Sequence, residues 1–378
     1  PSRLVVTLAN SLKPIPDEPV LGQTMSDHML ICEHDPVKGW SAPEIRPYGP
    51  LTLEPTANIL QYGGNAFEGL KAYAGPDGQP RLFRVERHME RLARGAQRAS
   101  LPSFDSAALA VLLKRLIAVE SRWVPAKPGY ALYIRPTIIS TRPYIGLGAS
   151  EHAILYIVLT PAAPFLGAGR PISLFAEEQN VRAWPGGTGA YKMGINYAGV
   201  SPQAEVQSRG YDQTLWLFGP DRCITEAGIM NCFVVLRRDD GGKYGLRHYD
   251  LITPPLDGTI LPGITRLSIL ELANAHTAGR TVLPGLPADR KIHTHEKVVT
   301  MPQVRAWAAN GTLQEFFCCG TAVIVVPVGR IWFDGADVVL GGRAGALGPV
   351  AAALRERLVD IQEGRASWEG WSTVVDLA

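Results

Sequence analysis

The stretch that most limits what this chain can form runs from Trp184 to Gly199, WPGGTGAYKMGINYAG. Four glycines lie close to Lys192 within it, namely Gly186, Gly187, Gly189 and Gly194. Glycine tolerates positive φ and lets the backbone approach a neighbour closely, so we expect a tight loop here and not a helix or strand. A lysine held on such a loop is either a solvated side chain or, when buried, an amine that loses its proton.

This loop does not match the common phosphate-binding motifs. A P-loop needs Gly directly before the lysine and Ser or Thr after it, whereas Tyr191 and Met193 flank Lys192. The single Gly-Thr-Gly at 187–189 is weak evidence for a dinucleotide site. A lysine that attacks a carbonyl, such as an aldehyde cofactor, is the chemical alternative to a solvated side chain.

Composition narrows the class of protein. The chain has 378 residues, of which 46% are apolar and 19% charged, which is typical of a globular protein with two domains. The net charge of +2 argues against nucleic acid or an anionic membrane as partner. The apolar runs are strand-sized, and residues 1–20 lack a signal pattern. We therefore expect a cytoplasmic protein, or a mitochondrial one if a presequence has been removed.

The five cysteines form no C-x-x-C motif and have no histidine at metal-ligand spacing. We therefore expect no metal site. An odd, sparse set of cysteines is typical of a reducing compartment.

An amphipathic helix is predicted over Val85–Arg98. Its apolar stripe consists of Val85, Met89, Leu92 and Ala96. Five arginines lie away from that stripe: Arg84, Arg87, Arg91, Arg94 and Arg98. Most of them are expected to be solvated, while one could bind a phosphate, and the spacing does not say which. Further helices are predicted over residues 107–121, 264–276, 301–309 and 349–362.

A strand is predicted over Tyr130–Ile139. With period-2 geometry, Tyr133 and Arg135 lie on one face, and Leu132 and Ile134 lie on the other. An arginine among apolar residues needs a partner, which is either a buried carboxylate of the protein or the carboxylate of a ligand.

The Pro- and Gly-rich stretch 161–171 is the best linker candidate. We place a first domain at residues 1–163, an interdomain loop at 164–174, and a second domain, which carries Lys192, at 175–378.

Three more features could bind a ligand. Glu226 lies in the segment Ile224–Asn231, which runs into a predicted apolar strand at Cys232–Leu236, and it is either a surface residue or a buried acid with a cationic partner. The amides near Gly263–Thr265 open a predicted helix and suit an anion. Cys319–Ala322, which opens a predicted strand at Val323–Val328, offers further amides and a hydroxyl. Together with Lys192 and an arginine, these features match pyridoxal phosphate, which needs an amine, a carboxylate at its ring nitrogen, and amides and an arginine at its phosphate.

Six motifs in this order resemble the branched-chain amino acid aminotransferases, which belong to the fold-type IV class of pyridoxal phosphate enzymes. The resemblance runs from about Met25 to about Gln362 and is closest to the longer subgroup. The motifs are Tyr62-Gly-Gly-Asn-Ala-Phe-Glu-Gly-Leu-Lys-Ala-Tyr73, Arg135 within Leu-Tyr-Ile-Arg-Pro, Gly189-Ala-Tyr-Lys-Met-Gly-Ile-Asn-Tyr197, Thr225-Glu-Ala-Gly-Ile-Met-Asn231, Leu261-Pro-Gly-Ile-Thr265 and Cys319-Gly-Thr-Ala322.

The resemblance implies an α/β (α+β) fold like that of D-amino acid aminotransferase. A small N-terminal α/β domain and a larger C-terminal α/β domain would hold pyridoxal 5′-phosphate between them. A homodimer is implied, in which the partner completes the substrate pocket.

The resemblance also implies the cofactor contacts. Lys192 matches the catalytic lysine, which forms the Schiff base and moves a proton between the substrate α-carbon and the cofactor. Tyr197 matches the tyrosine at the ring hydroxyl, Glu226 the partner of the ring nitrogen, and Arg91 the phosphate-binding arginine. Further phosphate contacts are implied for Ile264, Thr265 and Thr321.

The implied reaction is transamination of L-leucine, L-isoleucine or L-valine with 2-oxoglutarate, which gives branched-chain 2-oxo acids and L-glutamate. The implied pocket wall consists of Tyr62, Phe67, Tyr133 and Arg135, and Ala322 matches the cradle of the α-carboxylate. Tyr62 and Phe67 suit an apolar side chain. Arg135 with Tyr133 is the candidate partner for the side-chain carboxylate of glutamate.

Some positions depart from the family pattern. Ala190 replaces a common Asp or Asn, Ile229 replaces a common threonine, and Val323 and Val326 replace a cysteine pair of mammalian members. These departures leave two alternatives. One is a fold-type IV enzyme with other substrates, such as a D-amino acid or R-amine transaminase or an aminodeoxychorismate lyase. The other is a non-catalytic binding protein with the same fold.

Overall fold

The computed structural model describes residues 1–164, 170–238, 248–340 and 347–377. Contacts within the chain divide it into two compact units. Unit 1 contains Pro1–Pro164, Tyr191–Ile195 and Asp360–Ala378, and unit 2 contains Phe165–Ala190 and Asn196–Val359. Two segments that lie in the predicted second domain group with unit 1, namely Tyr191–Ile195 of the lysine loop and Asp360–Ala378. Residues 165–169 of the predicted interdomain loop lie outside the described residues.

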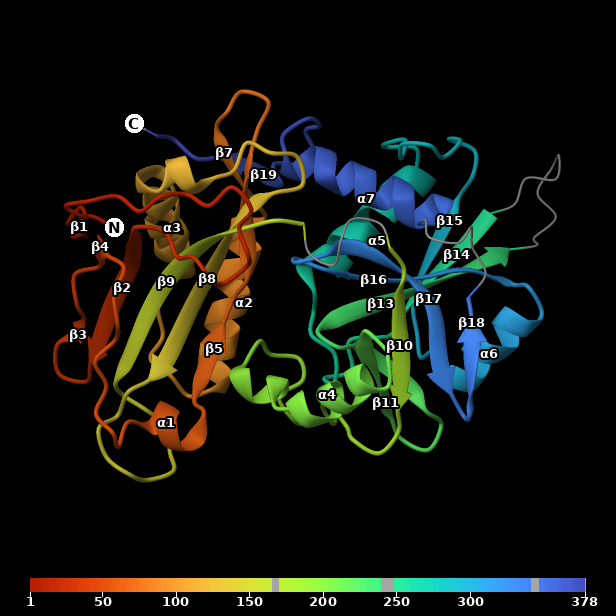
Figure 1. Ribbon diagram of the computed structural model, residues 1–378, viewed down its shortest axis with the longest axis horizontal. Coiled ribbons are helices and arrows are strands. Elements are labelled where there is room, and N and C mark those ends of the chain that lie inside the picture. Colours follow the sequence, from red (N-terminus) through yellow and green to blue (C-terminus); the bar gives the residue numbers. More distant parts are fainter. Residues whose placement is uncertain (165–169, 239–247, 341–346, 378) are drawn as a thin grey trace. The chain divides into compact units, whose positions relative to one another are not determined.

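Unit 1 contains a ten-stranded sheet (Figure 1). Its pairs are antiparallel apart from β1 with β4. Its strands, in spatial order, are β1 (Val5–Val6), β4 (Glu44–Pro47), β2 (His28–Asp35), β9 (Ala153–Ala162), β8 (Ala131–Ser140), β6 (Leu70–Ala74), β7 (Pro80–Phe83) and β19 (Ser372–Val374), with β3 (Gly39–Trp40) beside β2 and β5 (Asn65–Phe67) beside β8. Its helices are α1 (Asn58–Tyr62), α2 (Val85–Arg98), α3 (Ser106–Val119) and the short 3₁₀ turn η1 (Ser121–Trp123).

The core of unit 1 lies between its sheet and the helices α2 and α3. The predicted apolar stripe of α2 is confirmed, since Val85, Met89, Leu92 and Ala96 are all at most 1% exposed. The predicted alternation in β8 is also confirmed. Leu132 and Ile134 belong to the same core cluster as that stripe, so Tyr133 and Arg135 lie on the opposite face of the sheet.

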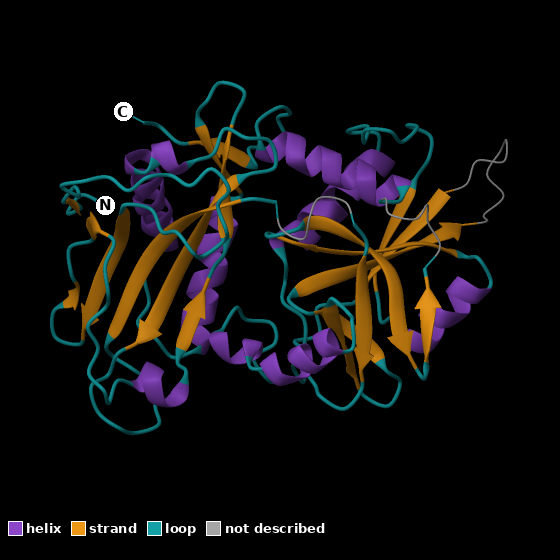
Figure 2. Ribbon diagram, in the orientation of Figure 1, coloured by secondary structure: helices purple, strands orange, loops and turns teal. Residues whose placement is uncertain are grey.

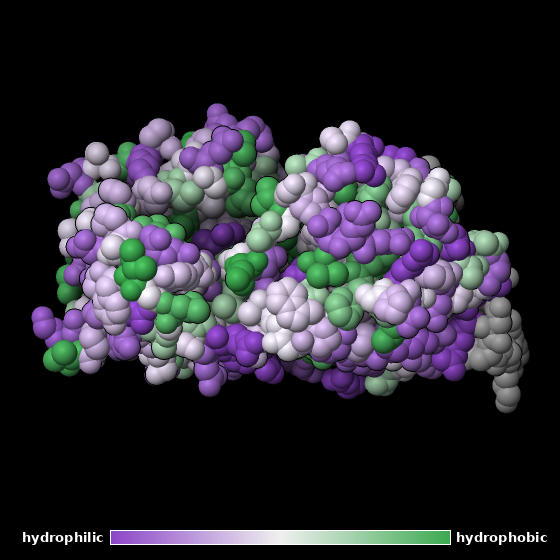
Figure 3. Space-filling model, turned by 90° about the horizontal axis from the view of Figure 1, so that it is seen from below, coloured by the Kyte–Doolittle hydropathy of each residue, from purple (hydrophilic) through white to green (hydrophobic). Residues whose placement is uncertain are grey.

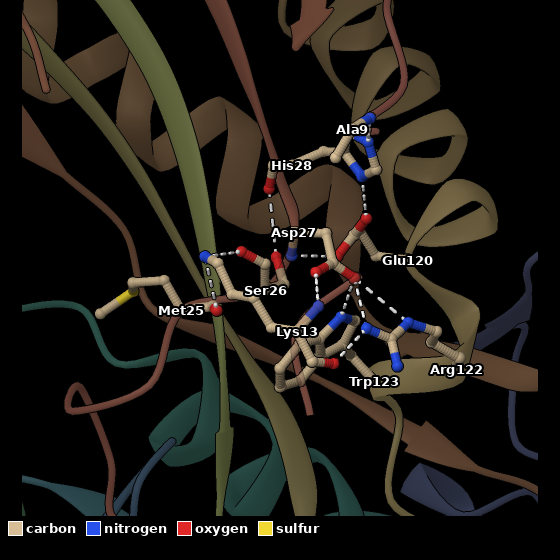
Figure 4. A network of polar contacts seen from close by, with 9 residues as sticks. All are labelled: Ala9, Lys13, Met25, Ser26, Asp27, His28, Glu120, Arg122 and Trp123. Carbon is tan, nitrogen blue, oxygen red and sulfur yellow. Dashed lines mark hydrogen bonds and ion pairs between the residues drawn. The ribbon is translucent and has the colours of Figure 1, made fainter. Parts of the chain in front are cut away.

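The segment before β2 is fixed to unit 1 by a buried polar network (Figure 4). The Asp27 carboxylate accepts hydrogen bonds from the Lys13 amide at 2.8 Å, from Trp123 Nε1 at 2.8 Å and from Arg122 Nη2 at 2.6 Å. Glu120 accepts from the Asp27 amide at 2.9 Å and from His28 Nδ1. Buried charges are tolerated when they are paired in this way, so this network holds residues 9–28 against η1 and the end of α3.

Unit 2 contains a nine-stranded sheet, part of which closes on itself. The spatial order is β12-β11-β10-β17-β16-β13-β14-β15, β18 pairs with β17, and β12 also pairs with β13. That last pairing closes six strands into a barrel. The strands are β10 (Ile172–Glu177), β11 (Gln213–Phe218), β12 (Cys223–Ala227), β13 (Met230–Arg238), β14 (His248–Thr253), β15 (Ile292–Glu296), β16 (Leu313–Gly320), β17 (Ile324–Phe333) and β18 (Ala336–Val339).

The strands of unit 2 are gathered at its centre with helices around them (Figure 2). The helices are α4 (Val200–Ser208), α5 (Ile264–Thr277) and α6 (Met301–Ala309), and both η2 (Gly194–Tyr197) and α7 (Pro349–Gln362) contain residues that group with each unit. Strands and helices together confirm the predicted mixed α/β class.

Two strands predicted in unit 2 are present, but the residues before them differ from the prediction. The strand predicted at Cys232–Leu236 lies within β13, and residues 224–231 before it belong to a hairpin of β12 and β13 with Gly228 at φ +57° in its turn. The strand predicted at Val323–Val328 corresponds to the start of β17, but Cys319 lies near the end of β16, and a turn separates the two strands. The sequence also gave no signal for α4, in which only Val206 is buried and no apolar stripe exists.

The surface is mostly polar. On the face shown in Figure 3, hydrophilic residues cover most of the area and hydrophobic residues form small, separate groups. Within the described ranges, the structure contains no helix with the length and apolar character needed to cross a bilayer.

Candidate functional site

The lysine loop is tied directly to β5. The Phe67 N–H donates to the carbonyl oxygen of Lys192 at 3.0 Å, and the Gly194 N–H donates to Asn65 Oδ1 at 2.8 Å. A Cβ atom on Gly194 would lie 2.6 Å from that Asn65 oxygen. Glycine is therefore required at 194 for the loop to approach β5 this closely.

The structure also explains why glycine occurs at the other three positions of the loop. Gly186 has φ +81°, whereas Gly187 and Gly189 are required by close contacts. A Cβ on Gly187 would lie 2.9 Å from the Trp184 carbonyl oxygen, and one on Gly189 would lie 2.5 Å from the Ala183 Cβ. The predicted tight loop is thus confirmed.

The amine of Lys192 is unusually ready to lose its proton. Its Nζ atom lies 5.1 Å from the centre of the Phe67 ring, and the side chain is only partly exposed. Burial and, second to it, the charge of Arg91 together lower the pKa of Lys192 to about 8, although Glu68 opposes this shift. A lysine with such a pKa is partly unprotonated near neutral pH, as a nucleophile or general base must be.

Of the arginines on α2, Arg91 is buried in an ion pair. Its Nε donates to Glu68 Oε1 at 2.6 Å and its Nη2 donates to Glu68 Oε2 at 2.9 Å. Arg84 is buried as well, but it stacks on Trp371 at 4.2 Å. The remaining three arginines are exposed: Arg87, Arg94 and Arg98.

Phe67, Tyr133 and Arg135 form one group on the face of the sheet opposite the helices. The Arg135 guanidinium lies 4.9 Å from the Phe67 ring centre and 5.4 Å from that of Tyr133, and its Nη2 donates to the Tyr133 hydroxyl at 3.2 Å. The Nε atom of Arg135 is buried without a hydrogen-bond partner among the described residues. Gly69 makes room, since a Cβ there would lie 2.0 Å from the Tyr133 hydroxyl.

Tyr62, the other residue expected in the pocket wall, lies at the end of α1 and is 40% exposed. Within one copy of the chain it is therefore a surface residue, unlike Tyr133, which is 9% exposed.

In unit 2, Glu226 is a buried acid with a cationic partner. Its Oε2 lies 3.2 Å from Arg182 Nε, and its Oε1 accepts from the Leu261 amide at 2.6 Å. The side chains of Arg182 and Glu226 are 6% and 2% exposed. Asn231, opposite Glu226 in the hairpin, places its Nδ2 atom 3.5 Å from Oε1. The surface alternative for Glu226 is excluded.

Two backbone segments of unit 2 match the predicted anion sites. Ile264 and Thr265 open α5 and are buried, and its N-cap residue, Gly263, supplies no capping side chain. The first amides of a helix have no partner within the helix, and they favour an anion. Thr321 and Ala322 lie in the turn between β16 and β17.

The expected site residues thus fall into two sets. Unit 1 holds Lys192, Arg91, Phe67, Tyr133, Arg135 and Tyr62, and unit 2 holds Tyr197, Glu226, Ile264, Thr265, Thr321 and Ala322. No group of three or more metal-binding side chains occurs in the described part of the chain.

Comparison with known sequences decides the family. The sequence model of the amino-transferase class IV family matches residues 65–331, which include the lysine loop, Arg91 and Glu226. The chain belongs to the class IV aminotransferase family. This aminotransferase is 42% identical over 98% of its length to the mitochondrial branched-chain-amino-acid aminotransferase of Schizosaccharomyces pombe, of which it covers 84%. It is 40% identical over 98% of its length to the cytosolic one of Saccharomyces cerevisiae, of which it covers 96%.

Solved structures agree on the fold of this aminotransferase. The branched-chain aminotransferase of Thermoproteus uzoniensis with norvaline superposes with a TM-score of 0.69 at 24% identity, over 92% of this chain and 100% of that one. The holo form of the enzyme from Thermobaculum terrenum gives a TM-score of 0.69 at 20% identity, over 96% and 100% of the two chains. The fold-type IV architecture expected from the motifs is confirmed.

Sequence reasoning missed two charged residues that this aminotransferase buries beside the candidate site. Glu68 lies inside the motif Tyr62–Tyr73, and only its position between two apolar segments indicated that it is buried. Arg182 gave no signal, because an isolated arginine before a glycine-rich loop is normally solvated.

Proposed function

We propose that this aminotransferase transfers the amino group of branched-chain L-amino acids to 2-oxoglutarate, with pyridoxal 5′-phosphate as cofactor. The observation that carries the proposal is the near full-length identity of 39–42% to proteins named branched-chain-amino-acid aminotransferase. The motif that holds Lys192 lies within the matched region.

The residues present fit this cofactor. Lys192 offers an amine with a pKa of about 8 for the aldehyde, and Arg91 offers a fixed guanidinium for the phosphate. Glu226 offers a buried carboxylate for the ring nitrogen. Tyr197 would contact the ring hydroxyl, and the amides and hydroxyls of Ile264, Thr265 and Thr321 would complete the phosphate contacts.

Each residue has a definite task in this chemistry. When bound, the cofactor supplies an electron sink for the charge that forms when the substrate loses its α-proton. Lys192 Nζ would accept that proton from the substrate α-carbon and would later return it on the cofactor side, and the first transfer requires an unprotonated amine. Glu226, with the Arg182 guanidinium 3.2 Å from its Oε2, would hold a proton on the ring nitrogen.

The pocket must accept two kinds of side chain in turn. Phe67 and Tyr133 provide apolar surface for leucine, isoleucine or valine. The Arg135 guanidinium, with its buried Nε, provides a charge for the side-chain carboxylate of glutamate. Amides around Ala322 would hold the α-carboxylate of either substrate.

We also propose that a homodimer is the active form, as the resemblance implies. The exposure of Tyr62, a residue expected in the pocket wall, supports a second copy that covers it. Light scattering on a gel-filtration column tests this, and an active monomer would contradict it. The compartment proposed is the cytosol or the mitochondrion, because relatives with both descriptions occur and all five cysteines are free.

The decisive experiment is a visible spectrum of the holoenzyme before and after addition of L-leucine. We expect a band of the bound cofactor that changes with L-leucine, and borohydride reduction followed by peptide mapping should label Lys192. Lys192→Arg should lose the band, and Lys127→Arg, a change at an exposed lysine paired with Glu18, should keep it. A panel of amino donors that favours D-amino acids or R-amines would refute the substrate proposal.

A further inference from the structure

Glu68 is a fully buried charge surrounded by donors. Its side chain is 0% exposed. It accepts two hydrogen bonds from Arg91, one from His88 Nδ1 at 2.8 Å and one from the Gly69 amide at 3.2 Å. An isolated buried carboxylate is costly, and it persists only where donors satisfy its oxygens. Burial alone would raise the pKa of Glu68, but the charge of Arg91 and the hydrogen bonds from Arg91 and His88 hold this pKa well below its usual range.

The contact between Glu68 and Arg91 fixes the plane of the Arg91 guanidinium. A guanidinium is planar, and Glu68 binds the edge formed by Nε and Nη2 with both carboxylate oxygens. The direction of the remaining edge, which carries Nη1, is therefore set by Glu68. A single oxygen contact would let the guanidinium rotate, whereas a bidentate contact leaves one orientation.

His88 supports this arrangement from the same helix. His88 and Arg91 are three residues apart on α2, so they share one face of it, and both are at most 5% exposed. Burial lowers the pKa of His88, and Glu68 opposes that shift. A neutral His88 donates its Nδ1 proton to Glu68 and adds no charge, so the charges of Glu68 and Arg91 balance each other.

The short segment 65–69, which contains Glu68, also holds the lysine loop. This segment begins with β5, and α2 runs beside β5 (Figure 1). Asn65 and Phe67 bind the backbone of the loop, Glu68 binds Arg91, and Gly69 lies against the Tyr133 hydroxyl. A shift of Glu68 would thus move the arginine relative to the lysine.

We propose that Glu68 is a positioning residue that orients Arg91 to receive the phosphate group of the cofactor. This inference rests on the proposed function and adds a residue to it. Glu68 acts through Arg91 and does not itself touch the phosphate, which its negative charge would repel. The phosphate is recognised by the direction of the Arg91 donors more than by net positive charge.

The test compares two ligands that differ only in the phosphate, pyridoxal 5′-phosphate and pyridoxal. Dissociation constants for both are measured with cofactor-free protein by absorbance. In Glu68→Gln, the amide NH₂ group faces the Arg91 donors, and the bidentate contact is lost. We expect pyridoxal phosphate to bind roughly 10- to 100-fold more weakly, as for the loss of an ionic hydrogen bond, and pyridoxal to change less than about 2-fold.

Two further variants make the result decisive. Glu68→Asp keeps the charge but is one methylene shorter, so it should show the same selective loss if orientation matters, and it serves if Glu68→Gln does not fold. Glu120→Gln is the matched control, because Glu120 is also buried in unit 1 and bonded to a histidine Nδ1, that of His28. It should lower stability without changing the ratio of the two dissociation constants.

Four outcomes would overturn the inference. Equal weakening for both ligands would mean that Glu68 is only structural, and no change would mean that Arg91 needs no support. Tighter binding of pyridoxal phosphate in Glu68→Gln would mean that net charge, not orientation, decides. If the unaltered protein itself does not prefer pyridoxal phosphate to pyridoxal, the phosphate role of Arg91 fails, and the cofactor proposal fails with it.

Discussion

Replacing Arg135 by alanine should separate the two substrates that share the proposed pocket. The Arg135 guanidinium touches the rings of Phe67 and Tyr133, and its Nε is buried without a partner among the described residues. An apolar substrate side chain makes no ionic contact with that charge. The side-chain carboxylate of glutamate does, so removal of the Arg135 guanidinium should lower kcat/KM mainly for glutamate.

The expected magnitudes follow from the contacts that disappear. An ionic hydrogen bond to a carboxylate is worth about 1.5–3 kcal/mol, which corresponds to a fall in kcat/KM for glutamate of roughly 10- to 150-fold. The lost ring contact costs about 0.5–1 kcal/mol for either substrate, or roughly 2- to 5-fold. The ratio of the two kcat/KM values should therefore shift against glutamate.

The assay follows each half-reaction separately, with L-glutamate or L-leucine added to the holoenzyme in single turnovers. Tyr133→Phe is the control, since it removes only the hydroxyl that accepts from Arg135 Nη2 at 3.2 Å. It should cause a smaller loss with glutamate and none with leucine. Equal losses for both substrates in Arg135→Ala would refute the role assigned to this arginine.

Three further predictions concern the buried charges. In cofactor-free protein, the reaction of Lys192 with an acylating reagent should show an apparent pKa of about 8, against 10.5 for ordinary lysines, because burial disfavours the charge of Lys192. Mass spectrometry of peptides labelled at different pH values checks this. If Lys192 titrates together with the other lysines, the prediction is wrong. Arg182→Leu removes the guanidinium that pairs with Glu226 and should lower the free energy of unfolding by about 3–5 kcal/mol, measured by urea unfolding. An unchanged midpoint of urea unfolding would show that this ion pair does not stabilise the fold. Burial alone would raise the pKa of Asp27, but hydrogen bonds from Lys13, Trp123 and Arg122 lower it below 3.8. The folded chain then binds fewer protons, so this stabilisation is present above that value and is lost as the pH falls through the folded pKa. Asp27→Asn should cost about 2 kcal/mol at neutral pH and flatten the acid end of the stability profile, and parallel profiles would disprove the assignment.

Much of the fold follows from local pattern. The bounds of α2, α6 and α7 match the expected helices, because apolar spacing and terminal residues act within one or two turns. The faces of β8 followed from alternation alone. By contrast, the β12–β13 hairpin was missed, since only Gly228, between Ala227 and Ile229, marks its turn.

The candidate site also contains residues that the sequence identified and residues that it did not. Motifs and their order were enough to single out Lys192 and Glu226 and to indicate the family. The motifs did not reveal roles that depend on contacts between residues far apart in the sequence. Arg182 is an example, because its ion pair with Glu226 joins residues 44 positions apart on different strands and loops.

The sequence by itself determined the bounds of α2, α6 and α7, which face of β8 is apolar, and that a lysine among glycines belongs to a tight loop. These depend on neighbours within a few residues. Only the tertiary structure decided which arginine of α2 is buried in an ion pair and that Glu68 fixes its direction. It also decided that burial lowers the pKa of Lys192. Desolvation and ion pairing depend on everything packed around a group, and a linear pattern does not contain that information.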